Sequence, residues 1–157
     1  MAARPDHPDV GDPAIDFTLA STHGLVQLSE LLEDGAVLLV FHPRDDTLVC
    51  TKQLCNYRDH LSMFAEYEVQ IVAINHDSLE SHRSFAEKYG LPFPLATDPD
   101  RKVSHAYGVL LDLFKSRRAM VLIGEDGRIW WRHSELRVFH RSAEDLREVL
   151  EQLRGVG

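Results

Sequence analysis

The two cysteines of the chain lie five residues apart, and their types and spacing suggest thiol chemistry. Cys50 and Cys55 are the only cysteines among the 157 residues. In a reducing compartment, two cysteines this close are more often catalytic or metal-binding than structural. A bridge between them would close a loop so short that it would restrict the unfolded chain little. The pair is therefore a candidate for redox chemistry.

The residues before Cys50 predict where its sulfur lies. The continuous apolar run at 36–41 is typical of a strand buried on both faces, and Pro43 interrupts it soon afterwards. Asp46 or Thr47 is expected to cap a following helix, which places Cys50 in the first turn of that helix. Free N–H groups and partial positive charge at a helix N-terminus favour a thiolate. The same N–H groups can hold an oxygen of an attacked peroxide.

The elements that must position this segment indicate an α/β fold. Alternating residues at 15–19 and 25–28 predict an N-terminal β-hairpin, and apolar runs at 36–41 and 69–74 predict core strands. Helices are expected at 48–66, 78–89, 100–107 and 142–153, an extended segment at 93–96, and a second hairpin with strands 119–123 and 128–132. This order predicts a central mixed sheet flanked by helices.

The composition is that of an acidic globular protein. Residues 1–157 are expected to form a single domain, with residues 1–12 as a loose lead-in. The net charge of −8 argues against binding to nucleic acid or to an anionic membrane. No apolar run approaches the ~18 residues that a membrane span needs, and the N-terminus lacks the apolar core of a signal peptide. A cytoplasmic location is expected.

The residues around Cys50 resemble the signature of a known family. Pro43, Thr47 and Cys50 form the pattern PxxxTxxC, which is similar to that of the peroxiredoxins. With Cys55 five positions later, the segment resembles the Q-type subgroup, which is also called the bacterioferritin comigratory protein subgroup. The chain is thus identified as a peroxiredoxin of this subgroup.

Two later segments support this resemblance, which extends over about residues 10–153. Residues 77–93 are similar to the segment that follows the third strand of the family. Residues 118–123 resemble the strand that begins with the family's catalytic arginine. Arg117 is the neighbouring candidate for this arginine, but the register of the apolar strand favours Arg118.

The resemblance implies a thioredoxin fold with an N-terminal β-hairpin extension, and it implies a role for each of five residues. Cys50 is expected to be the peroxidatic nucleophile, and Cys55 the resolving thiol. The hydroxyl of Thr47 is expected to hydrogen-bond the thiolate and the incoming peroxide. Pro43 shields the site from water, and Arg118 supplies positive charge to the thiolate and to the peroxide.

The resemblance also implies a reaction, the reduction of hydrogen peroxide and alkyl hydroperoxides. Attack by the Cys50 thiolate leaves a sulfenic acid, which condenses with Cys55 to an intramolecular disulfide. Thioredoxin or a similar dithiol reductant then restores both thiols. No cofactor and no metal are expected, and the family resemblance implies a monomer or a weak homodimer.

Helix geometry places a condition on this disulfide. Two residues five apart on an α-helix have Cα atoms about 8.6 Å apart. A disulfide needs a Cα separation of about 4.4–6.8 Å. If residues 50–55 are helical in the reduced protein, the segment from Thr47 to about Tyr57 must change conformation on oxidation.

The segment departs from the family pattern at three places. His42 stands where the family usually has tyrosine, and Leu48-Val49 replaces a common Pro-Gly pair. Gln53 replaces a common glutamate that pairs with the arginine. A neutral Gln53 leaves Arg118 either more available as a charge or less well oriented. These changes concern the rate and the peroxide preference more than the class of reaction.

The same residues are also compatible with functions other than that of a peroxidase. A peroxide-sensing redox switch could use the same two cysteines to change a partner surface. A disulfide exchange protein on the same fold would be expected to carry a C-x-x-C motif, which this chain lacks. A metal site built from Cys50, Cys55 and His60 lacks a fourth ligand at a standard zinc spacing.

Overall fold

The fold is described by a computed structural model, which covers residues 7–45, 47–109, 117–136 and 142–156. Its strands are β1 (Thr18–Ser21), β2 (Gly24–Gln27), β3 (Ala36–Phe41), β4 (Val69–Asn75), β5 (Leu95–Thr97), β6 (Arg117–Ile123) and β7 (Ile129–Leu136). Its helices are α1 (Leu28–Leu31), α2 (Leu48–Asp59), α3 (Leu61–Glu66), α4 (Leu79–Tyr89), α5 (Lys102–Ala106) and α6 (Ala143–Val156).

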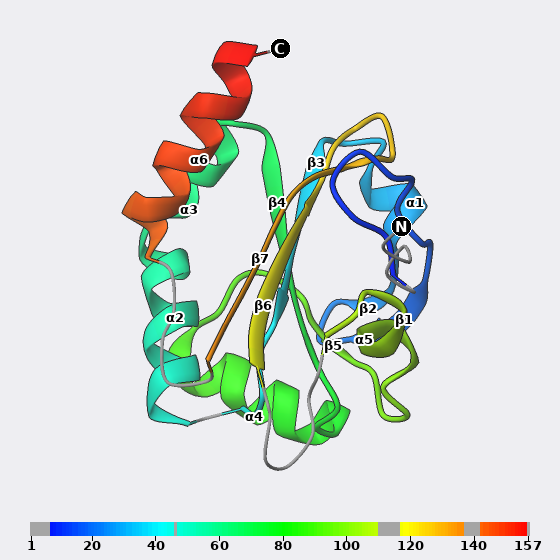
Figure 1. The fold of residues 1–157 in the computed structure, drawn as a ribbon. Helices are drawn as coiled ribbons and strands as arrows, with labels where there is room; N and C mark the ends of the chain where they lie inside the picture. The colour runs from blue at the N-terminus through cyan, green and yellow to red at the C-terminus, as the bar shows by residue number, and fades with distance from the viewer. Residues whose placement is uncertain (1–6, 46, 110–116, 137–141, 157) are drawn as a thin grey trace.

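The strands form one mixed sheet in the order β2-β1-β5-β4-β3-β6-β7 (Figure 1). The central strands β3, β4 and β5 run parallel, while the hairpin β1–β2 and the hairpin β6–β7 add antiparallel strands on the two sides. The mixed α/β architecture predicted from the order of elements is confirmed. Both apolar runs lie next to each other at the centre of the sheet, where helices cover both faces.

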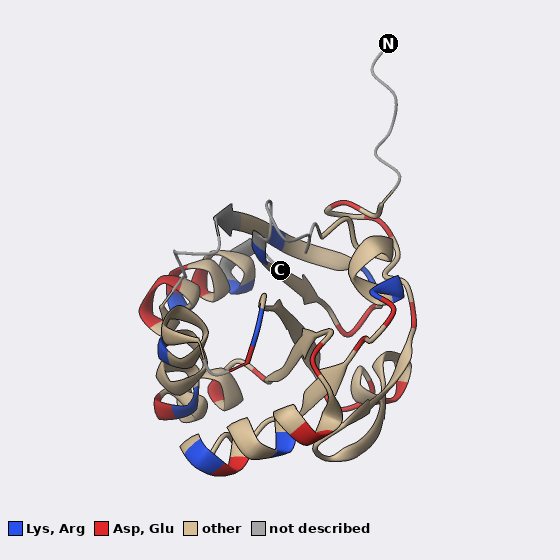
Figure 2. Ribbon diagram, turned by 90° about the horizontal axis from the view of Figure 1, so that it is seen from below, with Lys and Arg blue, Asp and Glu red and all other residues tan. Residues whose placement is uncertain are grey.

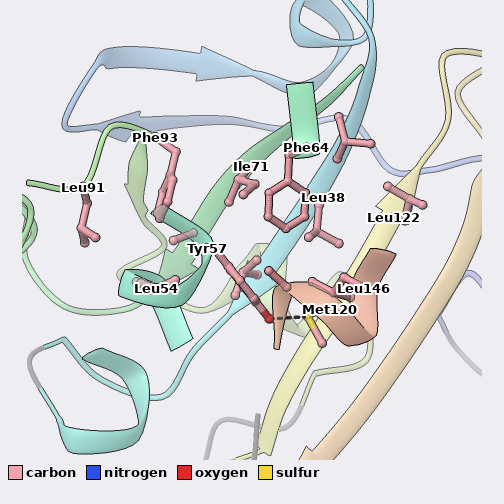
Figure 3. Close-up of a cluster of buried hydrophobic side chains, with 14 of the residues drawn as sticks. Leu38, Leu54, Tyr57, Phe64, Ile71, Leu91, Phe93, Met120, Leu122 and Leu146 are labelled. Carbon is pink, nitrogen blue, oxygen red and sulfur yellow. Dashed lines mark hydrogen bonds between the residues drawn. The ribbon is translucent and has the colours of Figure 1, made fainter. Parts of the chain in front are cut away.

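The alternation of side chains along β3 divides the core into two clusters, one on each face of the sheet. Leu38 and Val40 point to one face, whereas Val37 and Leu39 point to the other. The first cluster is covered by α2, α3, α4 and α6. Figure 3 shows the side chains of Tyr57, Phe64 and Leu146, from three of these helices, on the same side of the sheet as Leu38. The second cluster lies under α1, α5 and the N-terminal hairpin. The segment that carries Cys50 therefore starts from a strand that is packed on both faces.

The helix expected at 48–66 is in fact two helices, α2 and α3, because the chain leaves helical geometry at His60 (φ −117°, ψ 24°). The ring nitrogen Nδ1 of His60 lies 2.8 Å from the carbonyl oxygen of Asn56. That carbonyl is the one that the backbone N–H of His60 would bind in a continuous helix. The backbone N–H instead donates to the carbonyl of Tyr57 (3.1 Å), so the side chain replaces the main chain at this position.

Residues 7–12, the part of the predicted lead-in that the structure describes, bond to the body of the fold. Within residues 7–12, the N–H of Gly11 donates to the carbonyl of Ile129 (2.8 Å). Arg132 donates from Nη1 to the carbonyl of Pro8 (2.6 Å). These bonds hold the segment against β7. Smaller differences concern boundaries: β2 ends one residue early, β6 and β7 are longer than expected, and α5 is shorter.

The charged residues lie mainly on the helices and loops at the outside of the molecule, and the central strands carry few (Figure 2). Acidic and basic residues are interspersed on these outer surfaces, although the chain has a net charge of −8. Among the described residues, no helix has the length and apolar character required to cross a membrane.

Candidate active site

Cys50 lies in the first turn of α2, as the sequence predicts. The helix begins at Leu48 with Thr47 at its N-cap position, and Cys50 is its third residue. The first helical hydrogen bond runs from the N–H of Thr51 to the carbonyl of Thr47 (2.8 Å). The N–H groups before Thr51 therefore face the open end of the helix, where they favour an anion. Asp46, the other predicted cap, is outside the described residues.

Arg118 contacts the sulfur of Cys50 directly. Its Nη1 donates to Cys50 Sγ over 3.1 Å, and both side chains are buried, with relative exposures of 1% and 0%. The contact follows from the sheet: β6 runs antiparallel to β3 with Ala119 opposite Phe41, so Arg118 reaches the end of β3 where the chain turns toward α2. A guanidinium this close favours the thiolate form of a cysteine.

Gln53 holds the guanidinium in place. Nη1 of Arg118 donates to Gln53 Oε1 (2.7 Å), and Gln53 Nε2 donates to the hydroxyl of Tyr57 (3.0 Å). The hydroxyl of Tyr57 donates in turn to the sulfur of Met120 (3.3 Å; Figure 3). Gln53 thus orients Arg118 without adding a negative charge. The replacement of the family's glutamate by Gln53 therefore does not leave the guanidinium poorly oriented.

A pocket of about 310 Å³ lies beside Cys50. It is lined by Pro43, Arg44, Thr47, Leu48, Val49, Cys50 and Arg118. Four of the five residues predicted for the site therefore come together here. Thr47 is exposed at the pocket, and its hydroxyl donates to the carbonyl of Arg44 over 3.4 Å. Leu48 is 73% exposed and gives the pocket an apolar edge.

Cys55, the fifth predicted residue, lies outside this pocket. It is on the same helix, is partly buried and packs against the core cluster that covers one face of the sheet. Both cysteines are free thiols. Burial raises the pKa of Cys55, with the nearby Arg58 acting in the opposite direction and Asp59 adding to the increase. The Cys55 sulfur is therefore held as a thiol at neutral pH while α2 is intact.

The structure adds a group of buried polar residues behind the pocket that the sequence did not identify. Asp45 bonds to Asn75, to His82 and to His42, the last of which the sequence had marked only as a departure from the family. Asp45 and His82 are 37 residues apart. Residue spacing along the chain does not indicate a contact at such a separation. The histidine at position 42, where the family usually has tyrosine, was the one signal in the sequence that pointed to this group.

Comparisons with known proteins agree with this geometry. Residues 10–132 match the AhpC/TSA family. The chain is 32% identical to Peroxiredoxin Bcp of Bacillus subtilis over 149 residues, which cover 90% of this chain and 94% of that protein. It is 41% identical to chloroplastic Peroxiredoxin Q of Sedum lineare over 98 residues, 62% of this chain and 53% of the relative. The crystal structure of Peroxidoxin BcpB from Mycobacterium tuberculosis has a TM-score of 0.82 at 31% identity, covering 96% of this chain and 99% of that one.

Proposed function

Because the chain belongs to the AhpC/TSA family and is similar to Bcp and Q-type peroxiredoxins, we propose that it is a thiol-dependent peroxidase of that subgroup. The observation that carries the proposal is the 3.1 Å contact between Arg118 Nη1 and Cys50 Sγ beside an open pocket. A thiolate there has a cation beside it, helix N–H groups around it and room for a substrate nearby.

The proposed reaction consumes one hydroperoxide in each cycle. The Cys50 thiolate attacks one peroxide oxygen, the O–O bond breaks, and the departing oxygen takes a proton and leaves as water or an alcohol. Cys50 is oxidised to a sulfenic acid. The sulfur of Cys55 then attacks the sulfenic sulfur, water leaves, and the Cys50–Cys55 disulfide forms. Two electrons from an external dithiol return both residues to thiols.

Arg118 is proposed to stabilise the thiolate and the negative charge that develops on the peroxide. We expect Arg118→Ala to slow the reaction of the reduced protein with hydrogen peroxide by about 10²- to 10³-fold, the usual effect of losing one such donor. Stopped-flow kinetics would measure this rate. Arg83→Ala, which removes an exposed arginine on α4, is the matched control. An unchanged rate in Arg118→Ala would mean that the positive charge comes from another residue.

The disulfide requires α2 to unwind at its N-terminal end, because both cysteines lie on this helix. The far end of the segment is held in place: Asn56 Oδ1 accepts from the N–H of Ala143 (2.7 Å), and Tyr57 is fully buried. We therefore expect large amide chemical-shift differences between the reduced and oxidised proteins from Thr47 to about Tyr57, and small ones in α3. Near-identical shifts before residue 57 would contradict this expectation.

The volume and apolar edge of the pocket support alkyl hydroperoxides as substrates in addition to hydrogen peroxide. We further propose a thioredoxin-like reductant and a cytoplasmic location, since only two cysteines are present and both are assigned to the catalytic cycle. The protein is proposed to be a monomer or a weak homodimer, which analytical ultracentrifugation over a range of concentrations would test.

The decisive experiment mixes the reduced protein with hydrogen peroxide in a stopped-flow instrument and follows the product by intact mass. We expect a rapid reaction that ends two hydrogen masses below the reduced protein, and continued peroxide consumption when thioredoxin, thioredoxin reductase and NADPH are present. Oxidation that stops after one equivalent with several dithiol reductants would instead favour a redox switch. No reaction with peroxide would reject the proposed function.

A further inference from the structure

The connection between β3 and α2 is held from behind by a buried carboxylate that lies between two histidines. Oδ1 of Asp45 lies 3.0 Å from His42 Nε2, and Oδ2 lies 2.6 Å from His82 Nδ1. Both histidine side chains are fully buried, and the Asp45 side chain is 2% exposed. Asn75 Nδ2 also donates to Oδ1 (3.0 Å), and the hydroxyl of Ser81 donates to Oδ2 (2.9 Å).

The neighbouring bonds determine which groups donate. The amide oxygen of Asn75 accepts from the N–H of Asp77 (2.9 Å), so its NH₂ group faces Asp45 and His42. A bare nitrogen 3.0 Å from a carboxylate oxygen would be repelled, and we therefore assign the proton of His42 to Nε2. For the same reason the proton of His82 is on Nδ1. Each histidine therefore uses one specific ring nitrogen to bind Asp45.

The second nitrogen of each ring is buried without a hydrogen-bond partner among the described residues; these atoms are His42 Nδ1 and His82 Nε2. Asp45 is thus the hydrogen-bond acceptor for both buried rings. Nδ2 of Asn75 lies 2.9 Å from His42 Nε2, but both atoms are donors that bind Asp45 Oδ1, so they do not bond to each other. The described residues include no group of three or more histidine, cysteine, aspartate or glutamate side chains that could hold a metal ion. The arrangement is therefore suited to holding Asp45.

The side chains of His42 and Asp45 are buried, whereas the other described residues of the connection line the substrate pocket. Pro43, Arg44 and Thr47 line the pocket, and Arg44 and Thr47 are exposed. The backbone N–H of Asp45 donates to Asp77 Oδ2 (2.8 Å), which ties the main chain to the segment after β4 as well. The connection is thus fastened at Asp45 through both its side chain and its backbone.

The charge on Asp45 strengthens this fastening. Burial would raise the pKa of Asp45, but the hydrogen bonds from His42 and His82 lower it well below the ordinary value. The group is therefore a carboxylate at neutral pH, and hydrogen bonds to an ionised acceptor are roughly twice as strong as those between neutral groups.

We propose that His42, Asp45 and His82 form a positioning clamp that holds Pro43 and Thr47 in the geometry required for peroxide to reach Cys50. The clamp acts through the connection and not by contact with the reacting atoms, and the proposal rests on the proposed peroxidase function. His42, which replaces the usual tyrosine of the family, is the residue that makes the clamp two-sided in this chain.

Two pairs of matched substitutions test the clamp, because the side-chain amide nitrogen of asparagine lies near the position of Nδ1 and that of glutamine lies near Nε2. At position 42 the donor is Nε2, so His42→Gln keeps the bond to Asp45 and His42→Asn loses it. At position 82 the donor is Nδ1, so His82→Asn keeps the bond and His82→Gln loses it. Glutamine is thus the residue that preserves the bond at position 42, and asparagine is the one that preserves it at position 82. A general effect of side-chain size or polarity would favour the same residue at both positions.

Two rates are measured for each variant in a Cys55→Ser background, so that only Cys50 reacts. These are the second-order rates of oxidation by hydrogen peroxide and of alkylation by iodoacetamide. We expect His42→Asn and His82→Gln to slow oxidation by about 10- to 100-fold, since small displacements of positioning groups have effects of this size. Alkylation, which needs the thiolate but no peroxide geometry, should change by less than about threefold. His42→Gln and His82→Asn should keep both rates within that range.

Three results would overturn the proposal: equal oxidation rates for asparagine and glutamine at each position, a preference for the same residue at both positions, or a parallel loss of alkylation. If one mismatched variant does not fold, the pair at the other position gives the same comparison. If the Cys55→Ser parent does not react with peroxide, the peroxidase function itself is rejected. If the parent reacts but the histidine variants do not differ, only the clamp is rejected.

Discussion

Cys50→Ser is expected to abolish the consumption of hydrogen peroxide by the protein, with or without a reductant. A serine hydroxyl is not ionised at neutral pH, and neither Arg118 nor the N-terminus of α2 can change that, so the nucleophile is lost. Loss of an enzyme's nucleophile typically lowers the rate by about 10⁴- to 10⁶-fold. Peroxide consumption followed in the thioredoxin-coupled assay would therefore be indistinguishable from the background without protein.

The fold of Cys50→Ser is expected to remain intact, because serine is close in size to cysteine and the hydroxyl can accept the bond from Arg118 that the sulfur accepts. Circular dichroism and the melting temperature should therefore be near those of the wild type. The matched control is Cys55→Ser, the same chemical change five positions later on the same helix. Retention of wild-type turnover by Cys50→Ser would show that the nucleophile has been wrongly assigned.

Cys55→Ser is expected to react once with peroxide at close to the wild-type rate and then to stop. Cys55 is outside the pocket beside Cys50, and its removal leaves the contact between Arg118 and Cys50 Sγ in place. The oxidation rate should therefore stay within about threefold of the wild type. Thioredoxin-driven turnover should fall to background, because no intramolecular disulfide is available for exchange.

The product of Cys55→Ser distinguishes the resolving role from a packing role. Intact-mass analysis should find one added oxygen on Cys50, which a sulfenic-acid trap such as dimedone then labels, whereas the wild type should lose two hydrogens and give no adduct. The control is Ser84→Ala, which changes an exposed residue on α4. If Cys55→Ser continued to turn over with thioredoxin, resolution would take place between Cys50 and the external thiol, and Cys55 would be only a partly buried core residue.

Much of the reactive segment could be predicted from the sequence because it depends on local structure. A buried strand, an interrupting proline and a helix starting at Leu48 are properties of consecutive residues, and together they place Cys50 in the first helical turn. The alternation of strands and helices likewise predicted the mixed sheet. The break at His60 was missed because it arises from a side chain competing with the main chain for the carbonyl of Asn56, a contact that hydrophobic periodicity does not report.

The contacts that give the site its chemistry were decided only by the tertiary structure. Arg118 is 68 residues from Cys50, and Asp45 is 37 residues from His82. The resemblance to a family pointed to Arg118, but the distance to the sulfur depends on the antiparallel register of β6 on β3. The clamp around Asp45 similarly requires the ends of β3 and β4 to lie side by side. By itself, then, the sequence determined which sulfur lies at the N-terminus of a helix, because the start of a helix and its hydrophobic periodicity are set by neighbouring residues. The charges and hydrogen bonds around that sulfur come from distant residues, which only the folding of the sheet brings within bonding distance.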